Sequence, residues 1–130
     1  MLVIREEQIQ QLIAPDEPSR VRLIRNVVRE ANPDRVANYS DQLLDSMIRT
    51  GILRAESRGF SLAEDLAGFV AVMFEIAPNF DMQSDIDTVF NDTSHPPTDR
   101  LKYLWERVPE GAWAEAEASY DLKIWFPEQK

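Results

Sequence analysis

The twelve residues from Leu66 to Ala77 constrain the fold of this chain most strongly. They read LAGFVAVMFEIA, so eleven of the twelve are apolar or glycine and Glu75 carries the only charge. A helix that is apolar on nearly every side has to be surrounded by other elements. Twelve residues are also too few to span a bilayer, which takes about 20. The stretch therefore predicts a helix at the centre of a globular core.

The flanking residues predict where this central helix begins and ends. Ser61–Glu64 reads SLAE, which has the S-x-x-E form of a capping box that satisfies the first backbone N–H groups of a helix. Pro78 cannot continue a helix interior. We therefore expect one helix over residues 61–77.

Apolar residues recur at helical spacing in most of the remaining chain, and no segment alternates convincingly with the period of a strand. Gly59 fits the left-handed position that follows a helix, and Gly51 lies within an apolar stripe, where a close helix contact would explain it. We expect an all-α fold, with residues 1–121 as one domain of six or seven helices around residues 61–77. The expected flanking helices cover residues 2–13, 19–31, 41–58, a short segment with Ser84 as its N-cap, 101–108 and 109–120. Asn32-Pro33 is expected to end the helix at 19–31, because the residue before proline avoids the α region. Leu101, Leu104, Trp105 and Val108 have the spacing of one apolar helix face.

Composition limits the kind of protein. A chain of 130 residues is the usual size of one domain. The absence of cysteine excludes disulfides, thiolate metal sites and cysteine nucleophiles. The start, MLVIREEQ, lacks the basic residues and the longer apolar core of a secretory signal. We therefore expect a cytoplasmic protein with no membrane segment.

Charge is distributed unevenly along the chain. The net charge is −9; residues 1–58 hold nine basic and nine acidic side chains, whereas residues 59–130 hold five basic and fourteen acidic ones. Such a surface repels nucleic acid and anionic membranes, so neither is an expected partner. The acidic half suits a basic protein partner, although acidic surfaces also serve solubility.

One basic cluster departs from this pattern, on the outer face of the helix predicted over residues 19–31. It consists of Arg20, Arg22, Arg25 and Arg29. Nucleic-acid sites usually combine such a cluster with a basic domain and a known motif, and neither is present. We expect these arginines to form a solvated face or to pair with the acidic second half.

His95 is the only histidine, and it lies near Asp92 and Ser94. A catalytic triad needs these residue types in a fixed geometry, usually on a rigid element. Here they share one proline-ended loop. We expect an exposed loop histidine and no catalytic role.

The aspartates Asp81, Asp85 and Asp87 raise the possibility of a calcium loop. A loop of the EF-hand type that started at Asp85 would have Val89 at its fifth position and Pro96 at its last, where oxygen ligands are required. Asp85 and Asp87 fit better as acids that favour a helix N-terminus. We predict no metal site and no cofactor, and the acids supply no identifiable pair for an enzyme.

The aromatic C-terminal tail, residues 122–130, is the most suggestive feature for binding. It contains Ile124, Trp125 and Phe126, whereas chain ends are usually polar. The tail either folds back onto the core or forms an exposed anchor, since Trp and Phe are favoured at interfaces. The predicted partner-binding residues are Glu115, Glu117, Asp121, Trp125 and Phe126.

Several blocks of the chain resemble a bacterial family of small helical proteins. The blocks are MLVIREEQ at residues 1–8, GILRA at 51–55, Gly59 and Phe60, Asp65, Phe69, Met73 and Phe74, PNFD at 78–81, Pro96 and Pro97, Arg100 and Leu101, Leu104, and Glu106 and Arg107. Residues after Val108 depart from the pattern. The family is encoded beside type VI secretion effectors and spike-tip proteins, and its members resemble accessory or chaperone-like proteins for toxin loading.

This resemblance implies a non-enzymatic accessory protein, a co-adaptor or chaperone, that binds a type VI secretion effector or its adaptor before export. The alternative is an immunity protein that neutralises a toxin by binding it. Both classes are small, acidic and protein-binding, so composition does not separate them. The sequence sets no oligomeric state.

Overall fold

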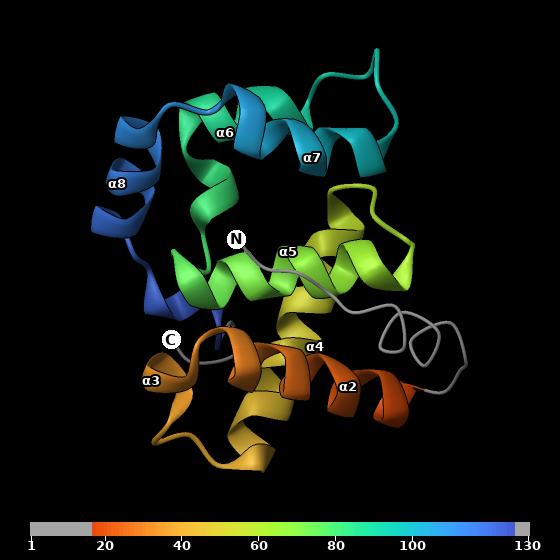
Figure 1. The fold of residues 1–130 in the computed structure, drawn as a ribbon, viewed down its shortest axis with the longest axis vertical. Coiled ribbons are helices and arrows are strands. Elements are labelled where there is room, and N and C mark those ends of the chain that lie inside the picture. Colours follow the sequence, from red (N-terminus) through yellow and green to blue (C-terminus); the bar gives the residue numbers. More distant parts are fainter. Residues whose placement is uncertain (1–16, 127–130) are drawn as a thin grey trace.

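Helices account for the regular structure of residues 17–126, the part of the chain that the computed structural model describes (Figure 1). This confirms the predicted all-α fold. The predicted helix at residues 2–13 and the last four tail residues lie outside the described part. None of the helices within it is long and apolar enough to cross a membrane.

The elements are α2 (Glu17–Ala31), α3 (Pro33–Val36), α4 (Asp41–Ser57), α5 (Ala63–Glu75), the 3₁₀ turn η1 (Phe80–Met82), α6 (Ser84–Phe90), α7 (Pro97–Arg107), α8 (Glu110–Ala118) and the 3₁₀ turn η2 (Leu122–Ile124).

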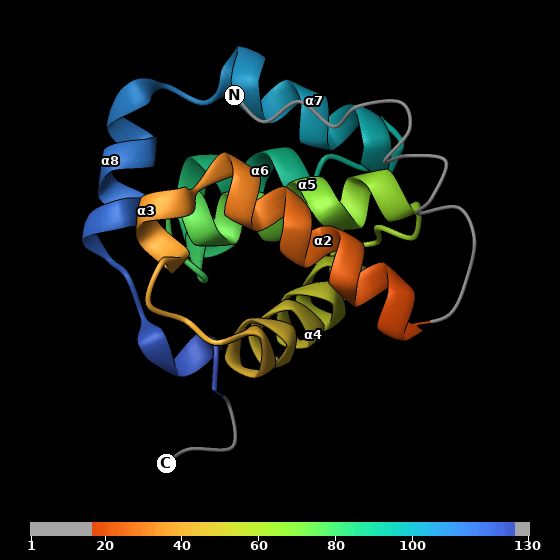
Figure 2. The ribbon, with the colours of Figure 1, turned by 60° about the horizontal axis from the view of Figure 1, so that its bottom comes forward.

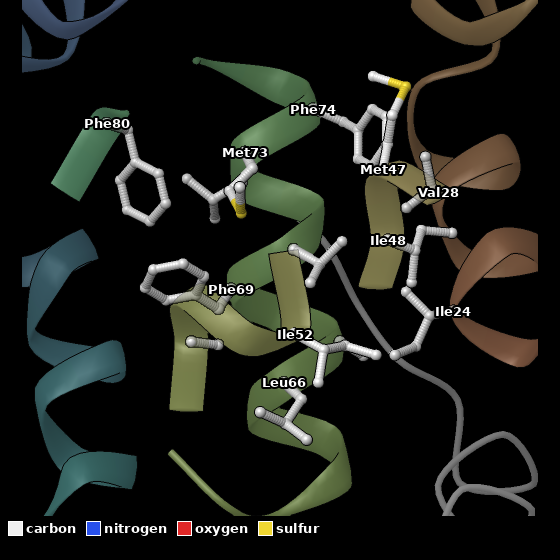
Figure 3. Close-up of a cluster of buried hydrophobic side chains, with 14 of the residues drawn as sticks. Ile24, Val28, Met47, Ile48, Ile52, Leu66, Phe69, Met73, Phe74 and Phe80 are labelled. Carbon is white, nitrogen blue, oxygen red and sulfur yellow. The ribbon is translucent and has the colours of Figure 1, made fainter. Parts of the chain in front are cut away.

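Helix α5 occupies the centre, as its apolar sequence predicts. It packs against α2 and α4 on one side and against α7 on the other (Figure 1). Figure 3 shows Phe69 directed toward Phe80, whereas Ile24 and Val28 of α2 lie on the other side of the helix. Phe69 and Met73 are both fully buried. The helix is apolar all round because both of its sides contact other helices.

The ends of α5 differ from the prediction. The helix begins at Ala63, and Leu62 occupies the N-cap position without any side-chain hydrogen bond. The Leu62 carbonyl instead accepts backbone bonds from Asp65 and Leu66 at 3.0 Å each. The capping box predicted from Ser61 is therefore wrong, because Ser61 lies one residue before the position from which its hydroxyl reaches the helix. The helix ends at Glu75, two residues before the predicted limit.

Two glycines have the roles that the sequence predicts. Gly59 follows α4 with a φ of 97°, a left-handed conformation that glycine adopts without steric cost. A Cβ atom on Gly51 would lie 2.9 Å from Val70 Cγ2 and 3.2 Å from Met73 Sδ. The absence of a side chain at Gly51 is therefore what lets α4 approach α5 so closely.

Four phenylalanine rings join α5 to the segment before it, to η1 and to α6. The rings of Phe60, Phe80 and Phe90 lie 5.7, 4.9 and 5.6 Å from the ring of Phe69, measured between centroids. Helix α6, which supplies Phe90, is capped by Gln83, whose side chain accepts from the backbone of Asp85 and Ile86. The prediction that Ser84 caps this helix is therefore wrong by one residue.

Candidate functional site

The aromatic tail packs onto its own domain. Trp125 is 1% exposed, and its ring lies 4.5 Å from that of Phe74. Its indole N–H donates to the Tyr120 hydroxyl at 2.9 Å, and Phe126 is half-buried. The interpretation that the tail covers the core is thus confirmed for Trp125 and in part for Ile124 and Phe126, whereas Leu122 and Lys123 are exposed. Trp125 is not an exposed anchor, because it fills a place in the core.

The three predicted acidic contacts are exposed. Glu115 and Glu117 lie on the outer surface of α8, and a carboxylate oxygen of Glu117 is 3.8 Å from a guanidinium nitrogen of Arg35. Asp121 caps η2 by accepting from the backbone N–H of Lys123 at 3.0 Å. All three carboxylates are therefore available to solvent, and their role in binding a partner stays a prediction.

A pair of stacked tryptophans on α7 and α8 was not predicted. The rings of Trp105 and Trp113 lie 5.2 Å apart with an angle of 15° between their planes. Trp113 in turn stacks on Phe80 at 6.4 Å, and Phe80 contacts Phe69 of the core helix. A continuous series of rings thus runs from the surface into the core. At its outer end, Trp105 is 39% exposed.

The helical spacing of residues 101–108 predicted that Trp105 lies on the buried face of the helix. This prediction is wrong for a large part of the ring, which is exposed. Trp113 covers one side of that ring, while Leu104 and Val108 occupy the buried face of the helix. The contact joins two helices that are separated by Pro109, so no rule of helical spacing reveals it. The exposed acids Glu106 and Glu110 lie on either side of this break. We call Trp105, Trp113, Glu106 and Glu110 the indole surface.

Asp81 belongs to an ion-pair cluster that joins α4 to the segment after α5. Its side chain is 2% exposed, and its two carboxylate oxygens are 2.7 Å from Arg54 and 2.8 Å from Arg58. Arg58 also binds Asp87 at 2.8 Å. Burial lowers the pKa of Arg58, but the hydrogen bonds to Asp81 and Asp87 outweigh it, so the net shift is upward. The cluster holds two parts of the fold together.

Asp81 and Asp87, two of the aspartates considered as calcium ligands, have their carboxylates bound by Arg58. Within residues 17–126 no group of three histidine, cysteine or acidic side chains is arranged to hold a metal ion.

The loop around His95 does not bring its polar groups into a triad-like order. The Ser94 hydroxyl donates to Asp92 at 2.5 Å, and the His95 Nε2 atom is 3.8 Å from the same carboxylate. Bonds from the hydroxyl and the backbone N–H of Ser94 hold the pKa of Asp92 below its usual range. A serine nucleophile instead needs its hydroxyl against the imidazole. The His95 side chain is about one-third exposed and packs edge-on against Tyr103, so it is less exposed than expected.

Two of the four arginines on the outer face of α2 are paired with acids of the neighbouring helix α4. Arg25 binds Asp45 through two bonds of 2.7 and 2.8 Å, and Arg29 binds Asp41 at 2.8 Å. The Arg29 bond and the charge of Arg25 lower the pKa of Asp41. The expected pairing with the acidic second half is therefore wrong for these two arginines, because α2 packs against the acids of α4.

Among the cavities of the described surface, two are lined by residues of several elements or helix turns. The first has a volume of about 270 Å³ and lies between α2 and α4. The second has a volume of about 150 Å³ and lies where α3, α4, α5 and the turn after α8 meet. The first is lined by Arg20, Arg49, Ile52, Leu53 and Glu56, and the second by Arg35, Tyr39, Met47, Phe74 and Tyr120.

Comparison of the chain with models of protein families, with curated proteins and with solved structures gives no match.

Proposed function

We propose that this protein is a non-enzymatic accessory protein that binds another protein through the indole surface. The proposed partner is a type VI secretion effector or its adaptor, bound in the cytoplasm before export, as the family resemblance implies. The observation that carries the binding role is the stacked pair of tryptophans at the surface, with Trp105 39% exposed.

The geometry of the stack supports a binding role in two ways. Tryptophan is enriched among the residues that contribute most to protein–protein affinity. In addition, Trp113 is held between Trp105 and Phe80, so the outer ring rests on a support fixed to the core. A side chain that is already ordered loses less conformational entropy when a partner binds.

The charge around the stack favours a partner with basic residues around an apolar pocket. Glu106 follows Trp105 in α7, Glu110 lies one turn before Trp113 in α8, and both are exposed, as are Glu115 and Glu117 farther along α8. Complementary charge acts mainly on the association rate and on specificity, and salt screens it over about 8–10 Å. The tryptophans are then expected to set how long the complex lasts.

The test is a comparison of Trp105→Ala with Leu122→Ala, using the partner that copurifies from the producing cell. Leu122 is 57% exposed, so it is a matched exposed apolar residue outside the indole surface. In surface plasmon resonance we expect Trp105→Ala to raise the dissociation rate at least about tenfold, a loss typical of a central tryptophan. Equal dissociation rates for the two variants would contradict the proposal.

Charge reversal tests the acidic part of the indole surface. Glu106→Lys combined with Glu110→Lys should slow association at low salt, and the difference should shrink at high salt. Glu64→Lys, an exposed acid at the start of α5, is the control. An unchanged association rate in the double variant would assign the acids to solubility alone.

A cell assay separates the accessory role from the alternative, an immunity protein. An accessory protein is required during export and does not protect cells that express the toxin alone. Rescue of such cells would identify an immunity protein instead.

A further inference from the structure

The smaller cavity brings a cation and two phenol groups to the edge of an apolar floor. Its volume is about 150 Å³, and four segments supply its lining: α3 with the turn after it, α4, α5 and the turn after α8. Met47 of α4 and Phe74 of α5 are only 2% and 6% exposed and form the floor. Arg35 of α3 and Tyr120 are about half exposed and Tyr39 is partly buried, so these three lining residues form the mouth. Figures 1 and 2 both place α3 next to the turn that follows α8.

The position of Tyr120 is fixed by its neighbours. The side-chain amide of Asn79 donates to the Ser119 carbonyl and accepts from the Asp121 backbone N–H, both at 2.9 Å, so it holds the turn on both sides of Tyr120. The Trp125 indole donates to the Tyr120 hydroxyl at 2.9 Å. A phenol that accepts such a bond still has its own O–H to donate.

The electrostatics of the mouth favour an anion. Among the described residues, Arg35 pairs with Glu117 at 3.8 Å, and both side chains are about half exposed, which makes the pair weak. Burial raises the pKa of Tyr120, and the Tyr39 phenol adds to this, while the Trp125 bond and the Arg35 charge act in the opposite direction. The Tyr120 phenol therefore stays protonated at neutral pH and can serve as a donor.

We propose that this cavity binds a carboxylate carried on a small apolar group. Arg35 and the Tyr120 hydroxyl would bind the carboxylate, and the apolar group would lie on Met47 and Phe74. Arginine matches the geometry of a carboxylate with two parallel bonds. A cavity of about 150 Å³ is the size that accommodates a benzene ring or a branched alkyl group. The ligand is either a free organic acid or the C-terminal residue of a polypeptide, since both present the same chemistry.

This inference concerns a different surface from the indole surface, and its test needs no protein partner. Isothermal titration calorimetry on the full chain would compare 3-methylbutanoate with 3-methylbutanamide, and N-acetyl-leucine with N-acetyl-leucinamide. We expect each acid to bind at least about tenfold more tightly than its amide, the loss expected for a missing charge-assisted bond. Tighter binding of N-acetyl-leucine than of 3-methylbutanoate would indicate a polypeptide C-terminus, and the reverse order a free acid.

The location of binding is tested by nuclear magnetic resonance. The indole N–H resonance of Trp125 should move on addition of acid, because its acceptor is the Tyr120 hydroxyl. The indole resonances of Trp105 and Trp113 serve as internal controls.

Four variants complete the test. Arg35→Gln should abolish the preference for acid over amide, whereas Arg107→Gln removes an equally exposed arginine from α7 and should not. Tyr120→Phe should weaken acid binding severalfold through the loss of one donor. Glu117→Gln should strengthen it by removing the competing carboxylate. Equal binding of acid and amide, or an unchanged preference in folded Arg35→Gln, would overturn the proposal.

Discussion

Replacement of Gly51 by alanine is expected to destabilise the protein, although alanine is the better helix former. The substitution gains about 0.8–1.0 kcal/mol in helix propensity. Against this, the new Cβ atom would lie 2.9 Å from Val70 Cγ2. Val70 is fully buried and branched at Cβ, so its χ1 angle has little freedom in a helix. Overpacking of this kind costs about 1–3 kcal/mol. We expect Gly51→Ala to lower the free energy of unfolding by about 1 kcal/mol after the propensity gain is subtracted.

Gly111 provides the matched control. It lies in the first turn of α8, and a Cβ atom added to it would meet nothing within 4 Å. Gly111→Ala therefore keeps part of the propensity gain, about 0.5 kcal/mol, at no packing cost.

Calorimetry can measure this difference between the two glycines. With an unfolding entropy of about 2.1 cal/mol/K per residue, 1 kcal/mol shifts the Tm of a chain of this length by about 4 °C. Gly51→Ala should then melt about 4 °C below the natural protein and Gly111→Ala about 2 °C above it. An increase in Tm for Gly51→Ala equal to that for Gly111→Ala would refute the close contact between α4 and α5.

The same structure makes predictions for the core, the ion-pair cluster and the pH dependence. Phe69→Ala should lower the free energy of unfolding by about 3–5 kcal/mol, because the ring is fully buried among three others, and thermal unfolding measures it. Asp81→Ala should cost about 3–5 kcal/mol in urea unfolding, since it leaves the largely buried Arg54 without its anion and Arg58 with Asp87 alone. Arg29 and Arg25 lower the pKa of Asp41, so stability from this group is present above its unfolded pKa and is lost as the pH falls through the folded value. Burial raises the pKa of Asp65 despite a hydrogen bond from Thr98. Its contribution to stability therefore has the opposite pH dependence: it is present below the unfolded pKa and is lost as the pH rises through the raised folded pKa. In urea unfolding from pH 2 to 6, the deficit of Asp41→Asn should shrink as the pH falls, whereas any deficit of Asp65→Asn should shrink as the pH rises.

The features that were predictable from the sequence are those set by residues close together in the chain. The apolar run of α5 identified the central helix, Gly51 was placed correctly from the spacing of its apolar stripe, and Gly59 from its position just after a helix. Caps proved less predictable. Ser61 and Ser84 both lie one residue from the true capping position, since capping depends on a backbone conformation that residue type only favours.

The short helix α3 shows another limit of local reasoning. Asn32 and Pro33 predicted the end of α2, because the residue before proline avoids the helical region. Proline is also favoured at the first position of a helix, and here Pro33 begins α3 immediately after α2 ends. The same residue therefore ended one helix and started the next, and only the first effect was anticipated.

Most of the candidate sites depend on contacts between distant residues. Arg54 and Asp81 are 27 positions apart, and Tyr120 lines one cavity with Arg35 and Met47, which lie far from it in the chain. No spacing rule predicts such pairs, because they follow from the way the helices pack. The exposed acids of α8 were easier to predict, since no apolar spacing required their burial.

The two tryptophans Trp105 and Trp125 show why residue type alone misassigned which aromatic side chain is exposed. Trp125 lies near a chain end, yet it is buried, because Phe74 covers its ring and Tyr120 accepts its N–H bond. Trp105 lies on a helix face predicted to be buried, yet Trp113 supports it at the surface. Removal of the tail would therefore expose core surface and lower stability, instead of removing a free anchor. Binding and stability are thus expected to separate between the two residues: Trp105 contributes mainly to a complex, and Trp125 to the fold on which that complex depends.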